Sequence, residues 1–188
     1  MPAIILFVSY AFFGVYPFGK NSVLSLDLNA QYVYYYDYMY DVIAGKESLF
    51  YSWSRTLSGE MMGIIGYYAA SPFMLSMYLF PREMITEGLL TIMVAKAGMT
   101  GLCFGLFLDK SRHTGRLTTI IISSSYALCS YFITQTMNPM WLDGVMILPI
   151  IALAIENLCK KGKFGLLVFA LSYGFITNFY IGYMLGIF

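Results

Sequence analysis

The chain has 188 residues, of which 59% are hydrophobic, 18% aromatic and only 11% charged. Soluble domains carry about a quarter charged residues, and a soluble fold of this length could not bury so much apolar surface, so lipid is the expected solvent. The net charge of +1, without any basic block, excludes nucleic acid as an expected partner.

Five apolar segments have or approach the roughly 20 residues that a helix needs to cross a bilayer. They predict an all-α, polytopic transmembrane helical bundle of about five spanning helices, near residues 2–18, 88–108, 117–137, 140–158 and 164–188. The first and last segments are apolar up to the ends of the chain. We therefore expect residues 1–188 to be the N-terminal part of one larger transmembrane domain.

Residues 19–87 are expected to form one long external loop with interfacial helices. Within it, residues 61–80 are apolar but are interrupted by Ser71-Pro72, and a proline removes a helical hydrogen bond, so we interpret this stretch as interfacial or re-entrant. Residues 32–40 read YVYYYDYMY. Such tyrosines are typical of a membrane-interface belt, and the alternative is a cleft that binds a sugar or a lipid.

Basic residues predict the orientation of the later helices. Lys and Arg gather in the linkers 109–116 and 160–163 and are absent from the link 138–144. Short cytoplasmic loops collect Lys and Arg, so the first two linkers are expected inside and the third outside. If residues 61–80 do not span, the N-terminus is also inside.

Ionisable side chains in or beside membrane segments are the candidates for chemistry, because they are costly there. Asp27 lies in the polar stretch LDLNAQY. The structural interpretation is a loop carboxylate or a helix cap, and the functional interpretation is a general base or a metal ligand. Asp143, beside Trp141, is expected on the same side, as a helix cap or as the second carboxylate of a pair. Lys96 either extends to the surface or faces the bundle, where it could pair with a carboxylate or hold a phosphate.

Several segments, in their order and spacing, resemble the YfhO family of bacterial membrane proteins. The most specific are SPF with the following LFP (71–81), MWLD with the downstream LP (140–149) and NFYIGYM (178–184). The resemblance covers nearly the whole chain. It implies a GT-C-type glycosyltransferase of the bacterial plasma membrane, a multi-pass protein whose active face is external. Family members are much longer, so residues 1–188 alone are not expected to form an active enzyme.

The resemblance also implies a reaction and its participants. The donor would be a sugar on a polyprenyl phosphate in the membrane lipid, and the acceptor a cell-wall polymer such as lipoteichoic acid. Asp27 matches the catalytic aspartate of the first external loop, and Asp143 matches a second acidic residue. The sequence has LDLN and WLD instead of a DxD or DE pair, so a divalent cation at Asp27 and Asp143 stays an open question. Candidates for substrate contacts are Lys96, Arg55, Asn29, Gln31, Tyr32 and Trp141.

Two other classes of function remain open on the sequence alone. A polytopic bundle with an intramembrane lysine also suits a transporter or lipid flippase, which would need a charged site near the midplane that opens to both sides. A structural subunit without activity is the third reading. The expected position of both aspartates at one surface favours chemistry over transport.

Overall fold

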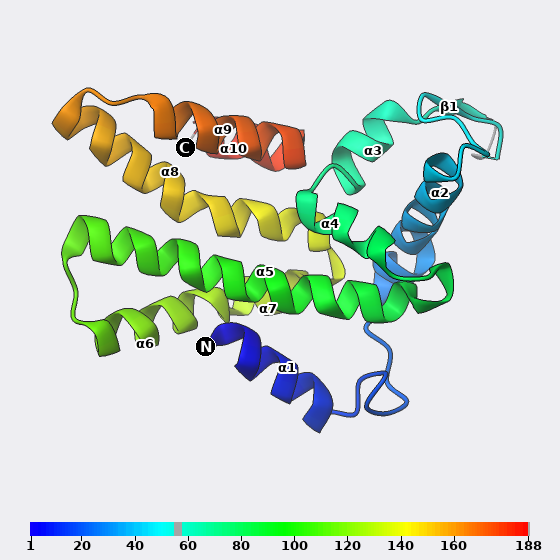
Figure 1. Ribbon diagram of the computed structural model, residues 1–188, viewed down its shortest axis with the longest axis horizontal. Helices are drawn as coiled ribbons and strands as arrows, with labels where there is room; N and C mark the ends of the chain where they lie inside the picture. Colours follow the sequence, from blue (N-terminus) through cyan, green and yellow to red (C-terminus); the bar gives the residue numbers. More distant parts are fainter. Residues whose placement is uncertain (55–57, 188) are drawn as a thin grey trace.

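The long apolar segments form the longest helices of the computed structural model, which describes residues 1–54 and 58–187 (Figure 1). Helix α5 spans Ile85–Phe107 and α8 spans Leu142–Lys161, while α6 (Arg116–Ala127) continues through α7 (Ser130–Thr134). Together with the short helical turns that flank them, these make three stretches, Arg82–Arg112, Arg116–Met137 and Pro139–Lys161, that are long and apolar enough to cross a membrane. The all-α bundle is confirmed, although the described residues have three such stretches and not five.

The first helix, α1 (Pro2–Phe12), is shorter than the expected 2–18. It ends before Gly14, whose φ of +62° turns the chain in a conformation that favours glycine. Helix α1 packs antiparallel on α5: Leu6 lies in one cluster with Ala97, and the Tyr10 hydroxyl lies 3.6 Å from the Met93 sulfur. This direction agrees with the arrangement expected if residues 61–80 do not span.

Between α1 and α5 the described chain forms only short elements, gathered at one end of the bundle (Figure 1). These are the π-helical turn η1 (Leu28–Tyr32), α2 (Val33–Ile43), the two-stranded sheet β1 (Tyr51–Ser52) and β2 (Gly59–Glu60), α3 (Met62–Tyr68), α4 (Pro72–Ser76), and the 3₁₀ turns η2 (Met77–Leu79) and η3 (Arg82–Met84). Strands β1 and β2 are antiparallel, with Tyr51 opposite Glu60. We call this end of the molecule the aromatic end.

The aromatic end is fastened to the bundle by polar contacts and by an apolar core. The Arg82 guanidinium donates to the carboxylates of Asp37 and Asp41, which lie one helical turn apart on α2. The Tyr40 hydroxyl lies 3.1 Å from the carbonyl oxygens of both Met77 and Phe80. Beneath these contacts, one core joins α2, η2 and α5 through ten buried side chains: Leu28, Tyr32, Tyr36, Met74, Met77, Ile85, Leu89, Ile92, Met93 and Met140.

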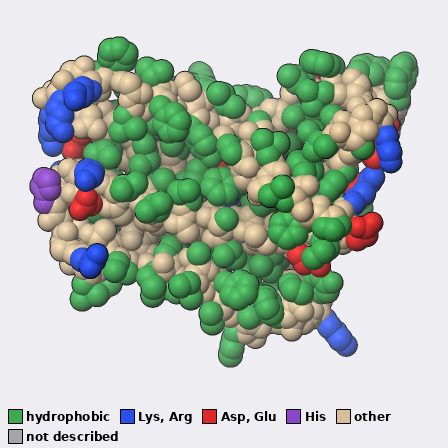
Figure 2. All heavy atoms as spheres, viewed as in Figure 1, with side chains coloured by type: hydrophobic (Ala, Val, Ile, Leu, Met, Phe, Trp, Pro, Cys, Tyr) green, Lys and Arg blue, Asp and Glu red, His purple; other side chains and the backbone are tan. Residues whose placement is uncertain are grey.

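The opposite end carries the basic linkers, and we call it the basic end. It comprises the π-helical turn η4 (Leu108–Arg112), the residues that lead into α6, and the turn between α8 and α9 (Gly165–Thr177). Figure 2 shows Lys and Arg side chains gathered there, charged residues at the aromatic end, and a broad hydrophobic surface between them. This distribution is that of a membrane protein, and the basic linkers predict that the basic end is cytoplasmic.

The segment 164–188 differs most from its predicted form of one spanning helix. It divides at Asn178, whose backbone is extended, into α9 and α10 (Phe179–Ile187), and the two helices fold back on each other. The Asn178 side chain explains the break: its amide donates to the Tyr67 carbonyl at 3.1 Å, and its oxygen accepts the Ile181 N–H at 2.9 Å. One buried residue thus caps α10 and ties the hairpin to α3.

We expect Gly182→Ala to destabilise this hairpin. A Cβ at position 182 would lie 2.7 Å from backbone atoms of Gly174, so α9 and α10 would have to separate. Overpacking of this kind costs about 1–3 kcal/mol, which should appear as a lower melting temperature of the detergent-purified protein. Gly186→Ala is the matched control, because a Cβ there would meet only the Phe175 ring at 3.4 Å. Equal melting temperatures for the two variants would contradict this packing.

Candidate functional site

A fully buried ion pair lies where the aromatic end meets the bundle. The Lys96 ammonium of α5 lies 2.5 Å from the Asp143 Oδ2 of α8, and neither side chain has any exposed surface. Lys96 also donates to the Pro139 carbonyl oxygen at 2.7 Å. Buried charges are tolerated only when they are paired and hydrogen-bonded, and this pair meets both conditions.

The second oxygen of Asp143 accepts two hydroxyl hydrogen bonds from other elements. Ser71, just before α4, donates at 2.9 Å, and Tyr173 of α9 donates at 2.7 Å. The pair therefore joins α5, α8 and α9 to the segment that follows α3. We call Lys96, Asp143, Ser71 and Tyr173 the buried network.

This geometry distinguishes the two placements expected for the Lys96 side chain and shows the surroundings of Asp143. Lys96 does not extend to the surface but pairs with a carboxylate inside the bundle, as one of the two alternatives predicted. Asp143 is the second residue of α8, where the helix N-terminus favours a negative charge. Its two oxygens are already occupied by three side-chain donors, so the arrangement favours a positioning role over the predicted direct catalytic one.

Asp27 lies in a different environment from Asp143. Its side chain is exposed, and the residue directly precedes η1 in the chain. The Tyr32 hydroxyl lies 3.4 Å from Asp27 Oδ2, and burial followed by the negative charge of Asp27 raises the Tyr32 pKa to about 12. Tyr32 therefore keeps its proton at neutral pH and presents a donor to the carboxylate. Among the described residues Asp27 has no ion-pair partner, whereas Asp37 and Asp41 both pair with Arg82.

The predicted pair of aspartates shares no hydrogen-bonding partner. Asp27 is exposed and Asp143 is completely buried, so a common site that uses both carboxylates directly is not favoured by this arrangement. In the part of the chain that the structure describes, no three His, Cys, Asp or Glu side chains gather as metal ligands. A metal at Asp27 or Asp143 stays a prediction.

The predicted substrate contacts other than Lys96 fall into three groups. Asn29 and Gln31 are exposed on η1 near Asp27, while Tyr32 is buried with only its hydroxyl directed toward that carboxylate. Trp141 is half-buried, and its indole N–H donates to the Tyr67 hydroxyl at 2.9 Å. Arg55 lies outside the described residues.

Sequence reasoning missed the roles of Ser71, Tyr173 and Tyr67. Each is a hydroxyl-bearing residue in an apolar stretch, and that is the signal that could have singled them out, because a buried hydroxyl needs a partner. The segments SPF, MWLD and NFYIGYM lie close together in the structure. Ser71 and Asp143 form a hydrogen bond, and Trp141 and Asn178 both form hydrogen bonds with Tyr67. Three distant segments thus converge around the buried network.

Comparison with known proteins gives one match. A family model described as "Bacterial membrane protein YfhO" matches residues 1–188. No curated protein and no solved structure matches the chain.

Proposed function

This chain belongs to the YfhO family of bacterial membrane proteins, and from that membership and the exposed Asp27 we propose that it is a GT-C-type membrane glycosyltransferase. It transfers a sugar from a polyprenyl-phosphate donor to a cell-envelope polymer such as lipoteichoic acid, on the outer face of the plasma membrane. The observation that carries the proposal is the placement of Asp27: an exposed carboxylate, without an ion-pair partner among the described residues, directly before η1 at the aromatic end.

The proposed reaction requires a base near the membrane surface. The oxygen of an acceptor hydroxyl attacks the anomeric carbon of the donor, and the bond from that carbon to the phosphate oxygen breaks. The polyprenyl phosphate leaves with the bonding electrons, and the hydroxyl proton passes to the Asp27 carboxylate. Tyr32, which stays protonated, donates toward that carboxylate and helps to orient it.

The buried network supports this chemistry without taking part in it. It fixes Ser71, and with it the start of α4, against α5, α8 and α9. The neighbouring Trp141–Tyr67 bond holds α3, and α3 packs beside η1 through the Tyr32 and Tyr68 rings, whose centroids are 4.9 Å apart. A rigid support of this kind holds a catalytic loop in its productive geometry.

The transporter alternative has less support. It needs a charged site that opens to both sides of the membrane. Lys96 and Asp143 are instead fully enclosed, and their charges and hydrogen bonds are satisfied inside the protein. The exposed Asp27 lies at one end of the bundle only.

A donor comparison tests the proposed function. The full-length protein, reconstituted in liposomes, is incubated with lipoteichoic acid and either a radiolabelled polyprenyl-phosphate sugar or the matching nucleotide sugar. We expect label in the polymer only with the lipid-linked donor. Label from the nucleotide sugar alone, or transport of the lipid without transfer, would contradict the proposal.

A further inference from the structure

The continuous helical stretch 28–43, formed by η1 and α2, has two faces of different character. One face is buried and carries Leu28, Tyr32, Tyr36 and Met39. The other carries Gln31, Tyr34, Tyr35 and Tyr38, which recur every three or four residues as positions on one side of a helix do. The tyrosine-rich sequence therefore serves two surfaces, and only one of them is explained by core packing.

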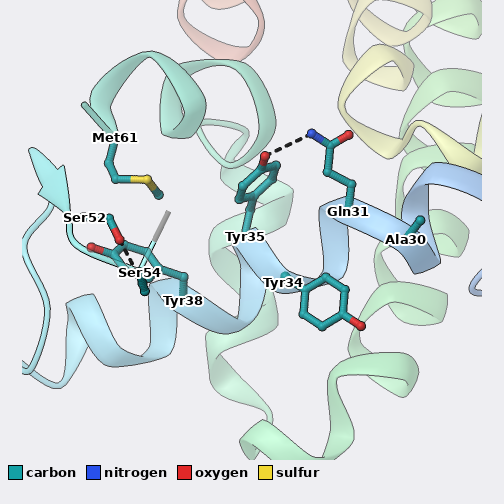
Figure 3. Close-up of a pocket in the computed structure, with 8 residues that line it drawn as sticks. All are labelled: Ala30, Gln31, Tyr34, Tyr35, Tyr38, Ser52, Ser54 and Met61. Carbon is teal, nitrogen blue, oxygen red and sulfur yellow. Dashed lines mark hydrogen bonds between the residues drawn. The ribbon is translucent and has the colours of Figure 1, made fainter. Parts of the chain in front are cut away.

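The second face lines a cavity of about 280 Å³ at the aromatic end (Figure 3). Its opposite wall includes Ser52 of β1 and Met61. Figure 3 shows the Gln31 amide donating to the Tyr35 hydroxyl, at 3.0 Å, and the Ser52 and Ser54 hydroxyls bonded to each other, at 2.9 Å. These contacts order the polar groups around the cavity. In the described part of the chain, the side-chain amide oxygen of Gln31 and the Tyr34 hydroxyl have no hydrogen-bonding partner.

The lining defines the chemical class of the occupant. Its described residues include no Lys, Arg, Asp or Glu, so none of these residues offers a side-chain charge to a phosphate or a metal ion. Aromatic rings beside hydroxyl and amide groups suit a ligand with apolar faces and a neutral polar rim, which is the chemistry of a sugar ring. Ligand pockets usually measure about 300–1,000 Å³, so this one fits a small unit.

We propose that this cavity binds one neutral glycosyl unit of a substrate, with Tyr34 and Tyr35 as its main contacts. The proposal rests on the proposed function and names a subsite for it. Gln31 follows Asp27 by four residues, about one helical turn, or roughly 6 Å along the axis. A sugar in the cavity is therefore within reach of the carboxylate proposed as base. The unit is either the sugar to be transferred or a sugar of the acceptor, and both present the same neutral ring.

Binding is measured without turnover. Saturation-transfer NMR on the purified protein uses neutral methyl glycosides of glucose, galactose and N-acetylglucosamine as probes, with glucose 1-phosphate as the anionic comparison. We expect at least one methyl glycoside to bind, and glucose 1-phosphate to bind more weakly than methyl glucoside. Tyr34→Ala and Tyr35→Ala should each weaken binding about fivefold or more, as expected for the loss of an aromatic contact, and Tyr34→Phe should retain most of it.

Tyr183→Ala is the matched control, because Tyr183 on α10 is 63% exposed and Tyr34 is 64% exposed. Any of three results overturns the proposal. These are equal glycoside binding by Tyr34→Ala, Tyr35→Ala and Tyr183→Ala, no glycoside binding by the unmodified protein, and glycoside binding that is weaker than the binding of glucose 1-phosphate. The transfer assay on Tyr34→Ala and Tyr35→Ala then identifies the sugar. A raised KM of these variants for the lipid-linked donor assigns the cavity to the transferred sugar, and a raised KM for the polymer assigns it to the acceptor. Tyrosine-dependent glycoside binding without any sugar transfer would leave the subsite standing and refute the proposed function instead.

Discussion

Replacing Lys96 by methionine will lower the free energy of unfolding by about 3–5 kcal/mol, because it leaves the Asp143 carboxylate buried without its counter-charge. The methionine side chain has nearly the length of the lysine stem, so little volume is lost. The loss should appear as a lower midpoint in reversible detergent-induced unfolding, together with a lower melting temperature.

Two further variants separate the charge from its surroundings. In Lys96→Met with Asp143→Asn, the buried charge is gone and an amide oxygen still accepts from Ser71 and Tyr173, so stability should return part of the way to that of the unmodified protein. Lys110→Met is the matched control, because Lys110 is 66% exposed and its pair with Asp109 should contribute at most about 1 kcal/mol. If Lys96→Met were no less stable than Lys110→Met, the buried pair would not support the fold as described.

The second large effect concerns activity. Asp27→Asn removes the proposed base while keeping the size of the side chain and its ability to accept from Tyr32. General-base catalysis contributes about 10²- to 10⁴-fold, so kcat for sugar transfer should fall by that factor with little change in the KM for the donor. Because the Asp27 side chain is exposed, the melting temperature should stay within the error of the measurement.

The control for this variant is Glu47→Gln, which neutralises another exposed carboxylate at the aromatic end. Its kcat should equal that of the unmodified protein. Full activity in Asp27→Asn, or an equal loss in both variants, would remove Asp27 from the reaction and leave only a general electrostatic effect of the loop.

The hydrophobic pattern predicted the parts of the fold that composition determines. Helices α5 and α8 follow directly from unbroken apolar stretches of spanning length, and the Ser71-Pro72 break correctly separates α3 from α4. The split of 164–188 was not predicted, because its apolar composition is uniform and the break depends on bonds from Asn178 to the distant Tyr67 and the nearby Ile181. Hydropathy contains no information about such tertiary contacts.

The candidate site also combines features that the sequence predicted with features that only tertiary contacts reveal. Lys96 and Asp143 could each be singled out as costly charges, but their pairing joins residues 47 positions apart and only the packing of α5 on α8 reveals it. Ser71 and Tyr173 are common residue types whose importance comes from their shared acceptor. In contrast, the two faces of 28–43 follow from helical periodicity, so the cavity-lining tyrosines were within reach of sequence reasoning.

A transfer assay resolved by side of the membrane tests the central claim most directly. Liposomes hold the protein in both orientations and a lipid-linked sugar donor in both leaflets, with deacylated, water-soluble lipoteichoic acid outside only. Cys159, exposed at the basic end, reports orientation through labelling by a membrane-impermeant maleimide in a Cys129→Ala background. We predict that transfer rises with the fraction of protein whose Cys159 is protected, since its aromatic end then faces the acceptor. Transfer that rises with the labelled fraction would place the chemistry at the basic end and contradict the account.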